Sequence, residues 1–163
     1  MGKSGVSLHW GGLDKALGRA TGKLGNTQAL MESVGEALVS GTKKRFDEKK
    51  DPEGTPWKPS RRALEKGGKT LMHSGRLRRS IDYAATSDKV MVGSNLAYAR
   101  IHQKGGTIKP KNGKSLKFKG LNGEDVLVKE VTIPARPYLG VSKEDMEDVK
   151  ATMADFLAGV FTA

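Results

Sequence analysis

The 163-residue sequence contains no cysteine, which excludes disulfide bonds, thiolate metal sites and thiol nucleophiles. Aromatic residues make up only 6% of the chain and hydrophobic residues 36%, enough for one core of ordinary domain size. Long apolar runs are absent too. No stretch approaches the about 20 residues of a membrane-spanning helix, and the first ten residues lack the apolar segment of a signal peptide. We therefore expect a protein that has no membrane partner and is made in the cytoplasm.

The usual signatures of catalysis are also missing. The three histidines, His9, His73 and His102, lack the spacing of metal ligands, and the sequence has no nucleophile elbow and no complete phosphate-binding loop. We therefore expect no enzyme activity, no metal and no cofactor. One enzymatic alternative stays open, because acids gather at residues 47–53 and 144–148 and a paired-carboxylate hydrolase needs two of them in one pocket.

What the sequence has in excess is positive charge. Lysine and arginine outnumber aspartate and glutamate by 29 to 18, and a formal net charge of +11 favours a polyanionic partner such as nucleic acid or an acidic protein surface. Residues 89–123 contain no acid at all. A solvated basic loop is the simpler interpretation of this run. The candidate contacts to DNA or to an acidic partner are Lys109, Lys111, Lys114, Lys117 and Lys119.

Two amphipathic helices are predicted near the ends of the chain. The first begins at Asn26 or Thr27 and carries an apolar stripe that includes Leu30, Val34 and Phe46. The second begins near Ser142, with acids in its first turn, where the helix dipole favours negative charge. Its predicted buried stripe consists of Met146, Val149, Met153, Phe156, Leu157 and Val160.

Strands are predicted between these helices. Residues 81–86 and 89–94 form a strand pair, a short helix follows at 97–103, and valines between 126 and 133 indicate one final strand. This order favours an α+β fold in which an antiparallel sheet is flanked by a long N-terminal helix and a C-terminal helix. We expect residues 1–25 to form an N-terminal arm with room for a short helix, and residues 26–163 a single domain. Within that domain, residues 107–123 form a basic loop or hairpin insert.

Two proline-bracketed segments stand out as rigid surfaces. Trp57 lies between Pro56 and Pro59, and residues 133–140 read IPARPYLG just before the last helix. Proline restricts its own backbone and that of the preceding residue, so both segments can hold side chains ready for a neighbouring subunit. Closing the chain's own core is the compatible alternative. The predicted subunit or partner contacts are Trp57, Arg76, Arg100, Lys104, Arg136 and Tyr138.

Several of these segments occur together, in order, in a known family. They are PEGTPWKP at 52–59, LMHSGRLRRSI at 71–81, VGS at 92–94, YARIHQKGG at 98–106 and IPARPYLG at 133–140. In this set the chain resembles the phage virion morphogenesis family, which includes the tail completion proteins of contractile-tailed phages and the G proteins of Mu-like phages. The resemblance covers roughly residues 28–160; the basic insert and the first 25 residues depart from it.

The resemblance implies a structural role without catalysis. It implies a small α+β subunit of the tail-terminator type that forms a homo-oligomeric ring, expected to be hexameric, at the head–tail neck or the head-proximal end of the tail. Such a ring completes or terminates the tail and permits head–tail joining in the virion. Its implied partners are copies of itself, tail tube and neck or connector proteins, and packaged DNA in the channel. A nucleic-acid-binding or capsid-assembly accessory that uses its basic loops is the alternative.

Overall fold

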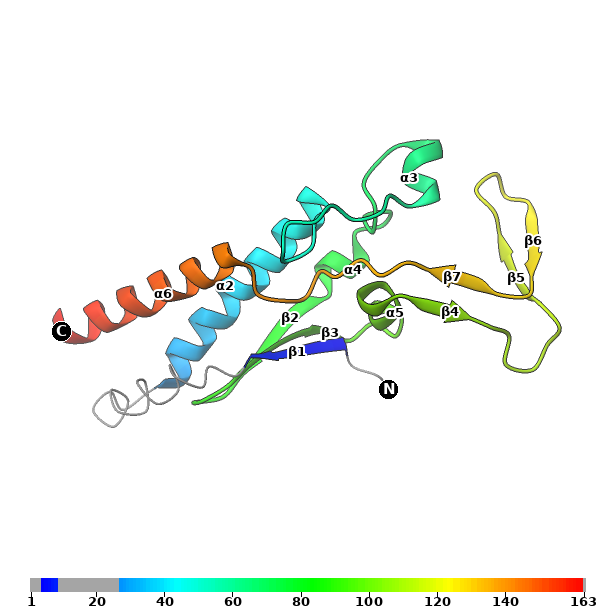
Figure 1. Ribbon diagram of the computed structural model, residues 1–163. Helices are drawn as coiled ribbons and strands as arrows, with labels where there is room; N and C mark the ends of the chain where they lie inside the picture. The colour runs from blue at the N-terminus through cyan, green and yellow to red at the C-terminus, as the bar shows by residue number, and fades with distance from the viewer. Residues whose placement is uncertain (1–3, 9–26, 163) are drawn as a thin grey trace.

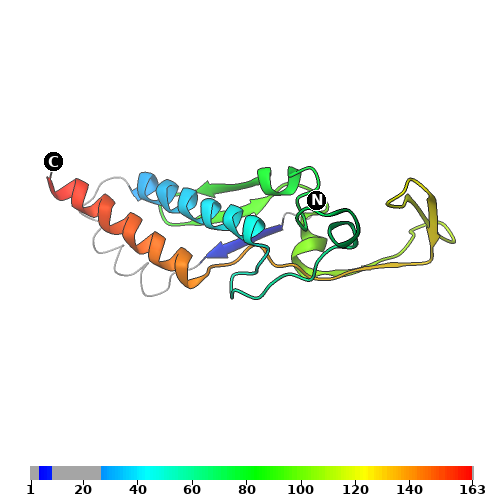
Figure 2. The same cartoon turned by 90° about the horizontal axis from the view of Figure 1, so that it is seen from above.

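The computed structural model describes residues 4–8 and 27–162, with side chains from 27 to 159. They form a helical layer packed on a small sheet, and a long arm extends from this body (Figures 1 and 2). Helix α2 packs on β2 and β3, and α6 packs along α2. The elements are β1 (Ser4–Leu8), α2 (Thr27–Glu48), α3 (Arg61–Lys66), α4 (Arg76–Arg79), β2 (Ile81–Ala85), β3 (Val90–Ser94), α5 (Ala99–Lys104), β4 (Gly106–Ile108), β5 (Leu116–Lys119), β6 (Asp125–Val128), β7 (Val131–Ile133) and α6 (Lys143–Thr162).

The body of the sheet has three antiparallel strands in the order β1-β3-β2. Val90 and Val92 alternate with exposed Met91 on β3, so one face of the sheet is buried, as a half-covered antiparallel sheet requires. The predicted α+β class, strand pair and terminal helices are therefore confirmed. Strand β1 was not predicted, and it joins this sheet although it lies in the expected N-terminal arm. The short helix expected around Leu13 to Leu24 falls outside the described residues.

Helix α2 is held against the sheet by its predicted apolar stripe. Leu30, Val34, Leu38 and Phe46 are all nearly inaccessible to solvent. The helix ends at Glu48, because Lys49 adopts a left-handed backbone with φ of 59°.

Helix α6 runs antiparallel to α2 and starts with a reciprocal cap. The backbone N–H of Asp145 donates to Ser142 Oγ at 3.0 Å, and the backbone N–H of Ser142 donates to Asp145 Oδ2 at 2.7 Å. Val149 and Met153 of the predicted stripe are buried against α2. Within the described part of the chain, no helix is long and apolar enough to cross a membrane.

A long arm leaves the body at the end opposite the C-terminus of α6 (Figures 1 and 2). We call residues 106–133 the arm. Its stem is the antiparallel pair β4–β7 and its tip the antiparallel pair β5–β6. The predicted basic insert at 107–123 lies within this arm, and the prediction of a single final strand at 126–133 is wrong. That stretch contains two strands, because β6 pairs with β5 at the tip and β7 pairs with β4 at the stem.

Candidate assembly interface

The IPARPYLG segment lies between the arm and α6, and its arginine points inwards. Arg136 Nε donates to the backbone carbonyl of Lys58 at 2.7 Å, and the backbone N–H of Arg136 donates to the carbonyl of His102 at 2.8 Å. The residue is only 6% exposed. Arg136 therefore joins three segments of its own chain instead of presenting a charge to a neighbour.

Trp57 and Tyr138 are core residues as well. Both rings pack on Phe46, with centroid distances of 5.5 Å and 5.1 Å. Trp57 Nε1 donates to the carbonyl of Pro137 at 2.8 Å, and the Tyr138 hydroxyl donates to the carbonyl of Ala99 at 2.8 Å. Burial raises the pKa of the Tyr138 phenol above its ordinary value, so the hydroxyl keeps its proton.

This burial corrects the prediction that Trp57, Arg136 and Tyr138 face another subunit. Aromatic rings between prolines are suited to an interface and to a core alike. In this protein the three side chains belong to the core, because Trp57 Nε1, Arg136 Nε and the Tyr138 hydroxyl each donate a hydrogen bond to a backbone carbonyl of the same chain.

One glutamine fastens the same segment to α5. Gln103 Oε1 accepts the backbone N–H groups of Tyr138 and Leu139 at 3.0 and 2.9 Å, and Gln103 Nε2 donates to the carbonyl of Leu139 at 3.0 Å. The irregular chain between β7 and α6 thus has its backbone groups paired, and the base of the arm is fixed to the body.

A buried ion pair, which the sequence did not reveal, joins α2 to α6. Arg45 Nη1 lies 2.5 Å from Asp145 Oδ2, and both side chains are less than 5% exposed. Arg45 also donates to the carbonyls of Tyr138 and Gly140 and to the hydroxyl of Thr42. Such a set compensates the desolvation of the guanidinium. The Ser142–Asp145 capping motif was a signal for Asp145, but nothing local marked Arg45 as its partner.

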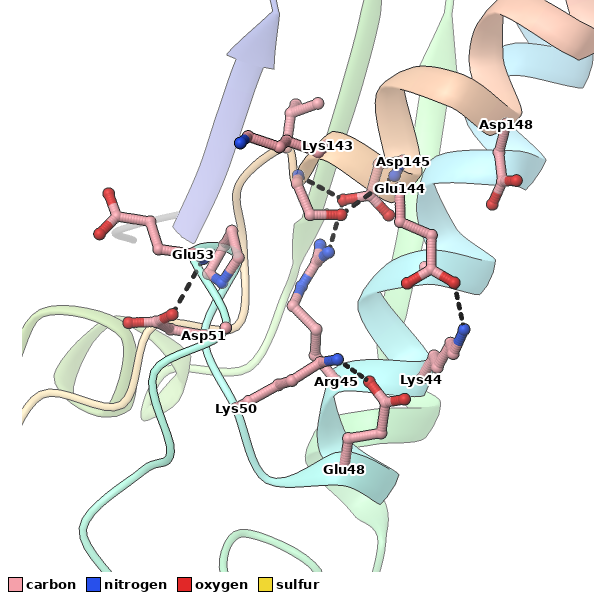
Figure 3. Close-up of a pocket in the computed structure, with 15 residues that line it drawn as sticks. Lys44, Arg45, Glu48, Lys50, Asp51, Glu53, Lys143, Glu144, Asp145 and Asp148 are labelled. Carbon is pink, nitrogen blue, oxygen red and sulfur yellow. Dashed lines mark hydrogen bonds and ion pairs between the residues drawn. The ribbon is translucent and has the colours of Figure 1, made fainter.

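Beside this ion pair, a cleft of about 440 Å³ opens between the end of α2, the loop at 50–54 and the start of α6 (Figure 3). Three of its lysines or arginines are paired with carboxylates: Lys44 with Glu144, Arg45 with Asp145 and Lys50 with Glu48. Within the described part of the chain, no ion pair involves Asp51, Glu53 or Asp148, three further carboxylates that line the cleft. We call it the acidic cleft.

The acidic cleft does not have the electrostatics of a hydrolase site. A general acid needs a carboxyl with a raised pKa. The pKa of Glu144 is instead lowered, because Lys44 donates a hydrogen bond to it and attracts its charge. Asp145 is occupied by Arg45. Among the described residues, no group of three His, Cys, Asp or Glu side chains is arranged to hold a metal ion.

His102 is the histidine with an unusual environment. Its Nδ1 is buried without a hydrogen-bond partner, and the ring lies edge-on to Tyr98 at 6.0 Å. Burial and the nearby Arg136 charge lower its pKa below the ordinary value. His73 is exposed, and His9 lies outside the described residues.

The other predicted contact residues are all exposed, three on the helices of the body and five along the arm. Arg76 is exposed on α4, while Arg100 and Lys104 are exposed four residues apart on α5. A contact role for these three stays a prediction. The five predicted lysines are exposed along the arm: Lys109, Lys111, Lys114, Lys117 and Lys119.

The arm brings acids next to its basic strand. Lys109 pairs with Glu130 at 3.3 Å, and Lys117 and Lys119 both pair with Asp125, at 3.3 and 2.8 Å. The acid-free run at 89–123 is thus partly neutralised by the returning strands. Counting residues 106–133, six lysines face three acids, which leaves a net charge of +3.

The described residues form a packed body with an exposed arm, and comparisons with known proteins agree with a structural role. The chain is 28% identical over 137 residues to "Putative capsid assembly protein G" of Escherichia phage Mu, a match that covers 78% of each protein. No solved structure matches. The model of the phage virion morphogenesis family matches residues 8–158. The chain therefore belongs to the phage virion morphogenesis family, as its motifs predicted.

Proposed function

We propose that this protein forms a ring at the head–tail neck or the head-proximal end of the tail, where it completes or terminates the tail and permits head–tail joining. Membership of the family over residues 8–158 carries the proposal and establishes a role in building the virion. The elongated shape supports the proposal, because an arm that extends from the packed body can reach a neighbouring subunit (Figure 1).

The proposal includes no catalytic step. Its support is the occupation of the acidic cleft by ion pairs and the lowered pKa of Glu144, which disfavour proton transfer there. The core built around Trp57 and Tyr138 supports a static role, because every polar atom of those rings is engaged by backbone.

The experiment is removal of the gene from the phage that carries it, with complementation from a plasmid. We expect lysates that contain DNA-filled heads and separate tails, and few joined particles in electron micrographs. Tails of abnormal length would identify a terminator function within the same proposal. Normal numbers of infectious, joined particles would overturn it.

A second candidate, an accessory role in capsid assembly, is favoured by the name of the Mu relative. The same lysates separate the two. If the capsid role is right, heads should be missing or aberrant while tails are normal. If the neck role is right, heads should be normal and fail to join.

A further inference from the structure

The tip of the arm carries an apolar face that lies outside the core of the body, with Leu116, Val126 and Val128 half-buried and Phe118 exposed. The β5–β6 register pairs Leu116 with Val128 and Phe118 with Val126, and these four side chains share one face of the hairpin. None of them belongs to the core cluster, and Phe118 is 44% exposed. A two-stranded hairpin is only marginally stable alone, so this face calls for a covering surface.

The arm is also the wrong surface for DNA alone. Asp125 begins β6, and Glu124 and Glu130 lie in the connections beside the returning strands, so all three carboxylates would repel a phosphate backbone. An apolar face flanked by lysines is complementary to a protein surface on which apolar side chains lie beside carboxylates. Lys111 and Lys114 are exposed and have no ion-pair partner in the described part of the chain, so their charges are available to such a surface.

The acidic cleft has that chemistry. Pro52 and Val141 line it together with Asp51, Glu53 and Asp148, three carboxylates without an ion-pair partner in the described part of the chain (Figure 3). Asp51 Oδ1 accepts the backbone N–H groups of Glu53 and Thr55, which leaves Glu53 and Asp148 as the carboxylates available to a partner. In a chain of net charge +11, a hollow lined by six acids and four lysines or arginines is a local exception. It therefore complements the arm rather than the rest of the surface.

We propose that the arm of one copy docks in the acidic cleft of a second copy, with the apolar hairpin face against Pro52 and Val141 and the arm lysines near Glu53 and Asp148. The arm and the cleft are different surfaces, and the arm extends away from the helices that form the cleft (Figures 1 and 2). Such a head-to-tail contact repeats from copy to copy and closes into a ring when the rotation permits. This inference rests on the proposed function, since it names the contact that builds the ring.

The test uses the purified full-length chain and native mass spectrometry. The arm variant is L116S/F118S, and the cleft variant is E53K/D148K. We expect each to weaken self-association by about tenfold or more, and wild-type association to weaken as salt rises. The matched controls are K58E/K150E and E36K/D155K, which change charge elsewhere on the surface and should associate as wild type does.

Mixing the two variants gives the sharpest result. The arm variant keeps an intact cleft and the cleft variant an intact arm, so together they should form one-to-one dimers that grow no further. The charge exchange K111E/K114E combined with E53K/D148K should restore association that K111E/K114E alone weakens. Circular dichroism checks that each variant remains folded.

Three results would overturn the inference. They are a wild type that stays monomeric at high concentration, an assembly that neither variant weakens, and binding to double-stranded DNA that only the arm lysines support. If assembly survives both variants while gene removal still leaves heads and tails unjoined, the proposed function stands and only this contact is wrong. If gene removal has no effect on joining, the proposed function fails whatever the arm binds.

Discussion

At the scale of single residues, the junction of α2 and α6 depends on one guanidinium. Arg45 reaches Asp145, Thr42 and the carbonyls of Tyr138 and Gly140, so it links both helices to the segment that supports the arm. A buried charge of this kind tolerates replacement of the whole pair better than removal of one partner.

We expect Asp145→Ala to lower the free energy of unfolding by about 3–5 kcal/mol, because it leaves Arg45 buried without its carboxylate and removes the cap of α6. Urea denaturation measures the change. Asp155→Ala, on an exposed turn of the same helix, should change stability by less than about 0.5 kcal/mol. The paired replacement R45M/D145L should recover most of the loss. A loss below about 1 kcal/mol in Asp145→Ala would show that the ion pair is dispensable.

His102 should make stability depend on pH in the neutral range. Its folded-state pKa lies below the ordinary 6.5, so the unfolded chain binds more protons and stability falls as the pH drops below about 6.5. The carboxylate of Glu144, whose pKa is lowered from 4.5, adds to the loss only in more acidic solution.

We therefore expect His102→Gln to flatten the stability curve between about pH 7.5 and about pH 5.5. Thermal denaturation at a series of pH values is the measurement. His73→Gln, which changes an exposed histidine, is the matched control and should keep the wild-type slope. An unchanged slope in His102→Gln would place the titrating group elsewhere.

The sequence indicated that some of these side chains are held in fixed positions, but it did not indicate whether they face the core or the surface. Trp57, Arg136 and Tyr138 were recognised as fixed by their prolines, yet local sequence does not say whether a fixed side chain faces in or out. Their buried state follows from carbonyls of residues far along the chain, such as Pro137 for Trp57 and Lys58 for Arg136. The Arg45–Asp145 pair was missed for the same reason, since its partners lie 100 residues apart.

At the scale of elements, α2 packs closely on the sheet because Gly35 has no side chain at the point of contact. A Cβ on Gly35 would lie 2.3 Å from Cδ2 of Tyr83 on β2, so only glycine permits this helix–strand distance. The periodicity of both long helices could be predicted, because apolar residues at helical spacing need a buried face whatever they contact. The pairing of β4 with β7 could not, because the stem strands are short and their partners are more than 20 residues apart.

Gly35→Ala should destabilise the protein by about 1–3 kcal/mol, although alanine favours the helical state. The reason is the overlap with the Tyr83 ring. Gly159→Ala is the control, because a Cβ there meets nothing within 4 Å, and it should leave stability unchanged or raise it by up to about 1 kcal/mol. Adding Tyr83→Ala to Gly35→Ala should relieve the clash and leave only the loss of the ring. Equal effects of the two glycine substitutions would contradict this packing argument.

At the scale of the whole molecule, the body and the arm have separate tasks. The body has a continuous core from α2 through the sheet to α6, and no side chain of the arm belongs to it. Of the six large hydrophobic side chains exposed among the described residues, three lie on the arm: Ile108, Phe118 and Leu127. The fold class and the family followed from the sequence because periodicity and motif order are local features. The arm's true extent did not, because it depends on strands that pair across a long loop.

This division predicts that the arm can be removed without unfolding the body. Thr107 and Thr132 face each other in the stem, so replacing residues 108–131 with Asn-Gly closes the ladder with a two-residue turn. Since no arm side chain enters the core cluster, the Tm should stay within about 4 °C of wild type, the shift that about 1 kcal/mol produces. The same variant should lose self-association and should fail to restore infectivity in the gene-deletion phage. Loss of the cooperative thermal transition would mean that the arm stabilises the body, and full infectivity would mean that virion assembly does not use it.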